Sequence, residues 1–390
     1  MSLLSLPAAA LVALAACAEE ASDDPNVALW ELADEPERSV GTLDGAEAEE
    51  LFRVQAARLL SDGTLALANA GTLEIRFFDE NGAFLHQVGG GGEGPGEFGN
   101  LGDIARLPGD TVVALDRSLH RMTVVDPEGS VADTWRVEPP ENGSAAPWSV
   151  HALGDGLLGI VARRQSTPAV PPGVIRPPAF VGVYRTDGEV LLEWAELGPG
   201  LEGYRLEEPN TLLARRPFGR NLHVTGGPDG LLAGTADDGR ILSIEPVDAG
   251  DALRLERDTL RLPLEPDPVT DEEVEAWKES QLEDAREADR EAFQREVNEA
   301  VTFPAEHPAY LGLERAPDGS VWVRERATGR EGRRWRIFER DGSERARLVL
   351  PSDARLLEVA DGAVLLRRTD ELDVERVELR RLVTADEGEP

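Results

Sequence analysis

A sequence unit that recurs after 47 or 48 residues restricts the fold of this chain more than any other feature. Three matches share a displacement of 48 positions, namely Val40-Gly41 with Val88-Gly89, Ala57-Arg58-Leu59 with Ala105-Arg106-Leu107, and Asp62 with Asp110. The displacement becomes 47 for Asp79 with Asp126 and for Gly82 with Gly129, as a one-residue difference in a turn would produce. Self-similarity of this length predicts one supersecondary unit that is repeated along the chain.

Each unit consists of short apolar runs separated by turn residues, a pattern typical of antiparallel strands. Residues 65–67 and 74–78 of one unit correspond to residues 112–115 and 121–125 of the next. The second run of each pair ends in Asp-x-x-Gly, where the aspartate accepts hydrogen bonds from backbone amides and the glycine adopts a positive φ. The runs on either side of these turns predict four strands per unit.

The same pattern continues through Asp-Gly pairs to the end of the chain, which gives six units. We therefore predict an all-β fold, a six-bladed β-propeller of four-stranded antiparallel blades over residues 27–383, followed by a polar tail at 384–390. The N-terminal runs 27–30 and 38–41 are expected to pair with the last unit, which lacks one strand. An open solenoid or a sandwich is the alternative.

Two insertions interrupt the repeats. The proline-rich segment 165–178 disfavours regular strand and is expected to form an extended loop. A second insertion at about 265–305 contains a predicted helix over residues 271–300, with Thr270 and Glu273 at the spacing of a capping box. The apolar stripe of this helix is weak, which favours docking on the propeller, where the helix would act as a lid.

The run Gly-Gly-Gly-Gly-Glu-Gly-Pro-Gly-Glu-Phe at residues 89–98, followed by Ile104 and by residues 121–129, resembles the connection between blades of NHL-type and TolB-like six-bladed propellers. The resemblance implies six blades around a channel that is lined by the first strand of each blade. Such propellers include lactonases, the peptidylglycine lyase domain and many binding or scaffolding proteins. The resemblance therefore predicts a fold without deciding between catalysis and binding.

The N-terminal segment has the features of a lipoprotein signal peptide over residues 1–17. An uncharged apolar stretch from Leu3 ends in Leu14-Ala15-Ala16-Cys17, which resembles the bacterial lipobox, and residues 18–26 form an acidic tether. We expect lipidation at Cys17 and a lipid-anchored location in the bacterial cell envelope, periplasmic or at the outer membrane. The leader lacks Lys and Arg, which is consistent with a start codon further upstream; ordinary signal cleavage and a fortuitous apolar leader are the alternatives.

Composition narrows the range of partners. The net charge of −35 repels phosphate backbones and anionic headgroups, so we expect no nucleic-acid partner and contact with the membrane through the anchor alone. A single cysteine excludes an intramolecular disulfide. We expect a monomer.

Residues typical of metal or phosphate chemistry are few. The five histidines include no pair at ligand spacing, although His151 and His223 fall in predicted innermost strands and are expected to face the channel. Equivalent strand ends carry Asn69, Asp116, Arg163, Asp237, Arg326 and Arg367, so cations occupy half of the positions that an axial calcium would need. We predict no cofactor. The glycine run at 89–96 lacks the Lys and helix of a phosphate loop and is expected to be a structural turn.

Arginine clusters stand out in the charge distribution of the chain. Positive charge gathers at residues 163–164, 215–220 and 324–336 in a strongly acidic chain. Such arginines bind a carboxylate or sulfated glycan if they line one mouth of the channel; ion pairing with neighbouring acids is the alternative that we favour for most of them. We favour a module that binds a protein, peptide or carbohydrate, with candidate residues Arg163, Arg326, Arg367, His151, His223, Asp116 and Asp237. The alternative is a lactonase-like hydrolase or lyase with its site on the channel.

Overall fold

The computed structural model describes residues 26–42, 45–140, 145–164, 173–205, 214–248, 253–284, 301–326 and 332–385. Most of this part of the chain is β-strand, with one α-helix, α1 (Asp271–Asp284), and one short 3-10 segment (Glu47–Glu49). The signal segment and Cys17 lie outside the described residues. No helix in the described ranges has the length and apolar character needed to cross a membrane.

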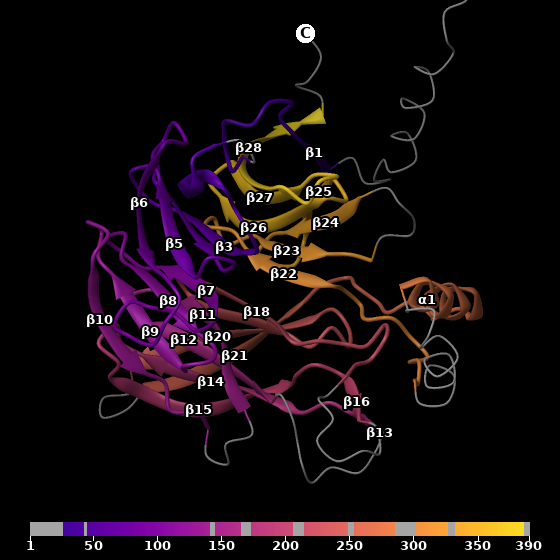
Figure 1. Cartoon of the computed structure of the whole chain (residues 1–390). Helices are drawn as coiled ribbons and strands as arrows, with labels where there is room; N and C mark the ends of the chain where they lie inside the picture. The colour runs from indigo at the N-terminus through magenta and orange to yellow at the C-terminus, as the bar shows by residue number, and fades with distance from the viewer. Residues whose placement is uncertain are drawn as a thin grey trace, which may run out of the picture.

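Four-stranded antiparallel sheets follow one another along the chain, as the repeats predict (Figure 1). The first four contain, in chain order, β3 (Val54–Leu59), β4 (Leu65–Asn69), β5 (Glu74–Phe78) and β6 (Phe84–Gly89); β7 (Leu101–Arg106), β8 (Val112–Asp116), β9 (Arg121–Val125) and β10 (Val131–Arg136); β11 (Ala145–Ala152), β12 (Leu158–Arg164), β14 (Pro178–Tyr184) and β15 (Val190–Pro199); and β18 (His223–Gly227), β19 (Gly230–Gly234), β20 (Arg240–Asp248) and β21 (Leu253–Arg261).

The C-terminal strands belong to a nine-stranded sheet that also contains the N-terminal strands. It joins two antiparallel groups, β22 (Gly312–Arg315), β23 (Val321–Arg324), β24 (Arg333–Phe338) and β25 (Glu344–Leu350), then β26 (Ala354–Ala360), β27 (Ala363–Thr369), β28 (Glu375–Thr384) and β2 (Arg38–Val40). Strand β1 (Ala28–Leu32) lies between the groups, parallel to β25 and antiparallel to β28. The predicted pairing of the N-terminal runs with the last unit is confirmed.

The first strands of consecutive groups contact one another in a cycle. Strand β3 contacts β7, β7 contacts β11, β11 contacts β18, β18 contacts β22, β22 contacts β26, and β26 contacts β3. Six buried apolar clusters lie between neighbouring groups, each drawing residues from both. This arrangement is consistent with a β-propeller, in which apolar faces that one sheet would expose are covered by the next sheet.

The Asp-x-x-Gly turns form as the sequence predicts. Asp79 Oδ1 accepts hydrogen bonds of 2.8 Å from the backbone amides of Asn81 and Ala83, and Gly82 has a φ of 83°. The hydrogen bond from the Ala83 amide is the main reason why the pKa of Asp79 lies below its ordinary value.

The glycine run at 89–96 is a structural turn, as predicted. It lets the chain fold back so that the Phe98 amide donates to Gly90 O at 2.8 Å and the Phe98 ring is completely buried between the first two sheets. A Cβ on Gly89 would lie 2.7 Å from Leu73 O, and its φ of 116° suits glycine alone.

The first insertion differs from the prediction, and the second agrees with it as far as the structure describes it. The proline-rich segment is not wholly without strand, because β13 (Gly173–Ile175) pairs with β16 (Gly203–Arg205), which pairs with β17 (Ala214–Arg215), and Pro178 begins β14. The physical reason is that proline lacks only the backbone N–H donor, so a proline-rich segment can still contain a short edge strand or begin a strand. Helix α1 is described to Asp284, so the predicted remainder to residue 300 lies outside the described residues. Its capping box is confirmed, since Thr270 N donates to Glu273 Oε2 at 2.9 Å and Glu273 N to Thr270 Oγ1 at 3.3 Å.

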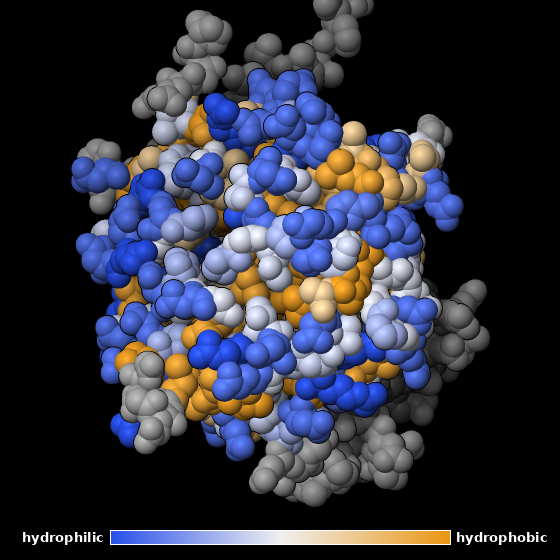
Figure 2. Space-filling view, turned by 90° about the vertical axis from the view of Figure 1, so that its left-hand side faces the viewer, coloured by the Kyte–Doolittle hydropathy of each residue, from blue (hydrophilic) through white to orange (hydrophobic). Residues whose placement is uncertain are grey.

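Helix α1 and the β13–β16–β17 sheet stand on the same side of the molecule, at the right of Figure 1. The opposite face is a mosaic of hydrophilic side chains and smaller apolar patches (Figure 2). Exposed apolar residues in small patches are ordinary on protein surfaces and do not by themselves mark an interface.

Candidate functional site

A cavity of about 630 Å³ lies where the first strands of all the groups meet. Its lining includes Arg58 of β3, Asp103 of β7, His151 of β11, Thr225 of β18, Glu314 of β22 and Arg355 of β26. We call this the central cavity. A cavity of this size suits a small molecule or the end of a larger chain, because ligand pockets typically span about 300–1,000 Å³.

Positive charge exceeds negative charge in the central cavity. Three carboxylates line it, against six arginines: Arg58, Arg106, Arg117, Arg163, Arg315 and Arg355. Three of the arginines have acidic partners, since Arg58 lies 3.9 Å from Asp103, Arg106 lies 2.7 Å from Asp110, and Arg315 lies 2.8 Å from Asp229.

The other three arginines, Arg117, Arg163 and Arg355, form no ion pair with any carboxylate of the described residues. Trp148 orders two of them, because its ring centroid lies 4.2 Å from the Arg117 guanidinium and 5.5 Å from that of Arg163. Burial, and then the neighbouring Arg117 and Arg215, lower the pKa of Arg163 to about 10. Asp103 is near enough to oppose the lowering of the pKa of Arg117 and Arg355 by burial, but among the described residues no carboxylate lies within ion-pair distance of the three guanidiniums.

Two carboxyl groups of the cavity hold their protons more tightly than usual. Burial raises the pKa of Glu314 to about 7, against the opposing effect of Arg58, and Thr225 Oγ1 donates to Glu314 Oε2 at 3.4 Å. Burial also raises the pKa of Glu358, whose carboxylate accepts the Leu59 amide at 2.7 Å. These shifts reduce the negative charge that would balance the arginines, and they make Glu314 able to exchange a proton near neutral pH.

His151 faces the central cavity, as the sequence predicts. Its Nε2 lies 2.9 Å from Ser149 Oγ, two residues earlier on the same face of β11. Burial lowers the pKa of His151 to about 4, and Asp103 opposes this effect only partly. The imidazole is therefore neutral at pH 7 and a weak base, which suits hydrogen bonding to a ligand better than activation of the serine hydroxyl.

His223, the second predicted channel histidine, lines a separate cavity instead. It stands at the start of β18, beside Tyr310 and close to Arg324, and both of these residues also line that second cavity. The lining of the central cavity does not include His223, because position in an innermost strand does not fix the level along the axis or the direction of the side chain.

The remaining predicted residues have partners within the fold. Asp116 is fully buried and accepts the amides of Gly99, Ser118 and Leu119 at 2.6 to 2.9 Å, so its carboxylate orders a turn. Asp237 pairs with Arg176 at 2.7 Å and Arg220 at 3.3 Å. Arg326 pairs with Glu273 at 2.7 Å, and Arg367 with Glu375 at 3.4 Å. Of the three predicted ligand arginines, Arg163 alone lines the central cavity.

The strand-end positions considered for calcium do not converge as a set of oxygen ligands. Asn69 is buried and bonds Phe52 N and Thr72 Oγ1, so it serves the turn after β4 much as Asp116 serves the turn after β8. Within the described ranges, no group of three or more His, Cys, Asp or Glu is placed to hold a metal ion.

Sequence reasoning missed Glu314, Arg355 and Arg117 as site residues. Position in the repeat could have identified two of them, because Glu314 and Arg355 fall in the first strands of the fifth and sixth repeat units. A charged residue in such a strand is notable, since a strand surrounded by blades is otherwise expected to be apolar or small.

Comparisons with known proteins support the fold class. No family model matches the chain. No curated protein sequence matches it either. A solved structure of a protein described as exported, from Bacteroides fragilis, is 12% identical, covers 91% of this chain and 95% of its own, and has a TM-score of 0.53. A member of the DUF4221 family from Bacteroides vulgatus is 10% identical, covers 92% and 99%, and has a TM-score of 0.51.

More distant similarity extends to enzymes. A catalytically inactive virginiamycin B lyase from Staphylococcus aureus is 12% identical over 87% of this chain and 82% of its own, with a TM-score of 0.41. At these identities the similarity concerns the fold alone, which is of the β-propeller type.

Proposed function

We propose that the protein is an exported, lipid-anchored six-bladed propeller whose central cavity binds a ligand that carries a carboxylate group. Closure into six blades is supported by the contact cycle of the first strands and by the pairing of β1 and β2 with the last two groups. Export is supported by the apolar leader and by similarity to a protein described as exported.

The observation that carries the binding proposal is the group of arginines without acidic partners in a protein of net charge −35. Arginines that line a cavity without an ion-pair partner repel one another, as the lowered pKa of Arg163 reflects, so a ligand that supplies negative charge is favoured there. Guanidinium groups bind carboxylates with two parallel hydrogen bonds, and Trp148 offers an aromatic face beside them. A carbohydrate acid or a peptide with a free carboxylate fits this lining, and binding to arrays of each distinguishes the two.

Replacement of Arg355 or Arg163 by glutamine is expected to weaken binding of acidic glycans or carboxylate-terminated peptides by roughly tenfold or more, because each change removes one charge-assisted contact. Retention on arrays of acidic glycans and of peptides measures the effect. Arg185→Gln is the matched control, because Arg185 is exposed and pairs with Glu189 on the outer part of its sheet. Equal retention by wild type and both cavity variants would contradict the proposal.

Lipidation at Cys17 is expected to be the single point of membrane attachment. Cells that express the wild type should incorporate labelled palmitate into the protein, and Cys17→Ser should abolish that label, since the thiol is the acceptor in a lipobox. The folded part is unaffected by this change, so a urea unfolding curve provides the control. Equal labelling of both proteins would show that the anchor lies elsewhere.

A hydrolase or lyase that uses Glu314 is the second candidate. The specific observation in its favour is a carboxyl group with a pKa of about 7 in a cavity that also holds Arg58 and Arg355. Assays on lactones and phosphate esters, together with metal analysis of the purified protein, separate the two functions. Turnover that disappears in Glu314→Gln would favour the enzyme over the binding module.

A further inference from the structure

A second cavity, of about 590 Å³, lies beneath helix α1 and is lined by different residues from the central cavity. Its walls come from the β17–β18 connection, from α1 and from residues 307–311. We call it the helix-side cavity. It combines arginines with aromatic rings, and its volume again falls in the range of small-molecule sites.

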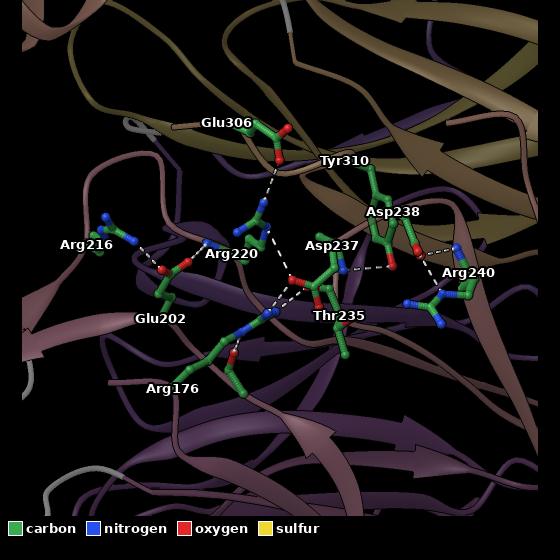
Figure 3. A network of polar contacts seen from close by, with 12 residues as sticks. Arg176, Glu202, Arg216, Arg220, Thr235, Asp237, Asp238, Arg240, Glu306 and Tyr310 are labelled. Atoms are coloured by element: carbon green, nitrogen blue, oxygen red, sulfur yellow. Dashed lines mark hydrogen bonds and ion pairs between the residues drawn. The ribbon is translucent and has the colours of Figure 1, made fainter. Parts of the chain in front are cut away.

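A network of ion pairs fixes one wall of this cavity (Figure 3). Arg216 pairs with Glu202 and donates through Nε to Thr302 O at 3.0 Å. Arg220 bridges Asp237 and Glu306, each at 3.3 Å. Because these contacts tie the β17–β18 connection to the chain around residues 302–306, the wall is held in place before any ligand enters.

Helix α1 is held over the cavity by its first turn and by an aromatic cluster. Glu273 accepts Arg326 Nη1 at 2.7 Å and lies 3.1 Å from His307 Nε2, while Trp277 packs edge-to-face on Phe303. Hydrogen bonds from the Thr270 amide and from His307 lower the pKa of Glu273 to about 2. The carboxylate on this wall is therefore already engaged, and it does not neutralise the arginines opposite.

Three polar groups in the cavity remain without such partners. Arg215 is exposed and forms no ion pair with a carboxylate of the described residues. Arg324 donates through Nη2 to Leu311 O at 2.7 Å, yet its Nε is buried without a partner. Asn221 Oδ1 is also buried without a partner. Burial and the nearby Arg163, Arg324 and Arg215 lower the pKa of His223 to about 3, which reflects the positive potential here.

We propose that the helix-side cavity binds a small carboxylate that bears a ring and a hydroxyl group, with its carboxylate on Arg215 and Arg324 and its hydroxyl donating to Asn221. The ring would lie among the aromatic residues Phe218 and Trp277, which also line the cavity. Uronic acids and hydroxylated aromatic acids share this chemistry. The site is distinct from the central cavity in its lining, because the two cavities share no residue.

The test is calorimetric titration of the purified full chain with D-glucuronate and with 4-hydroxybenzoate, each beside its neutral analogue, D-glucose and 4-hydroxybenzyl alcohol. We expect saturable binding of one acid and none of its neutral analogue. Arg215→Gln and Arg324→Gln should each weaken that binding by roughly tenfold. Arg215 is exposed, so its replacement keeps the test valid should Arg324→Gln fail to fold. Arg240→Gln, an exposed arginine paired with Asp238, is the matched control.

Arg355→Gln separates the two cavities. Binding that survives in Arg355→Gln and is weakened in Arg215→Gln supports the helix-side site, whether or not the central cavity also binds a carboxylate. Loss in Arg355→Gln with normal binding in Arg215→Gln would overturn the inference and assign the acid to the central cavity. Absence of saturable binding of both acids at millimolar concentration would overturn it as well.

Discussion

Replacement of Trp322 by alanine is expected to lower the free energy of unfolding by about 3–5 kcal/mol, the usual cost of removing a large aromatic side chain from a packed core. Trp322 lies in β23 and is 1% exposed, and its ring centroid lies 5.8 Å from that of Trp30 and 6.4 Å from that of Trp335. Because Trp30 belongs to β1, the cavity left by the change also loosens the attachment of the N-terminal strand. Urea unfolding followed by fluorescence measures the loss.

Leu372→Ala provides the comparison for this variant, since Leu372 is 77% exposed and its replacement should change the free energy of unfolding by less than about 0.5 kcal/mol. Limited proteolysis of Trp322→Ala should cleave first near residues 28–32, where β1 contacts β25 and β28. If Trp322→Ala unfolds at the same urea concentration as Leu372→Ala, the cluster around Trp322 does not stabilise the fold as described.

The strands and turns were predictable because each repeat contains two signals that agree: apolar runs that indicate the strands, and Asp and Gly residues that indicate the turns between them. Asp79 and Gly82 illustrate this agreement, since one supplies the acceptor and the other the positive φ that the turn needs. The pairing of β2 with β28 was also predictable, because a missing strand at one end matched a surplus run at the other. The parallel pairing of β1 with β25 had no such signal.

The β13–β16–β17 sheet was not predictable for the opposite reason. Its strands are short, occur once, and include Gly173 and neighbouring prolines that lower strand propensity. Their pairing depends on contacts between segments about 30 residues apart, such as Val174 with Tyr204. Tertiary context of this kind overrides local propensity.

The site was less predictable than the fold because four of the six first strands contain an irregularity of register. Such shifts occur between Val54 and Ala56, Leu101 and Asp103, Pro147 and Ser149, and Leu356 and Glu358. Each shift reverses the alternation of facing directions, so sequence alternation does not reveal which residues face the axis. His151 and Arg163 were anticipated as axial candidates, whereas Glu314 and Arg355 emerge only when the strands are seen together.

Glu314→Gln is expected to stabilise the protein above pH 7 and to leave its stability almost unchanged near pH 4. A folded-state pKa of about 7, raised from the ordinary 4.5, means that the folded protein keeps a proton that the unfolded chain releases as the pH rises through this interval. The wild type therefore loses stability between about pH 4.5 and 7, at about 1.4 kcal/mol per unit of pKa difference. Glutamine removes this cost, with an upper limit of about 3 kcal/mol at pH 8.

Urea unfolding of both proteins at intervals from pH 4 to pH 8 measures the difference, and Glu128→Gln, the same change at an exposed turn, should show no pH-dependent gain. His151 has the opposite dependence, because its lowered pKa removes stability as the pH falls, but both proteins share it and it cancels in the difference. A stability difference that is constant across the range would show that Glu314 does not titrate near neutrality, and it would remove the support for proton transfer in the central cavity. A difference that grows with pH would mean that the fold retains a destabilising carboxyl group at its axis, which is typical of a residue kept for its function.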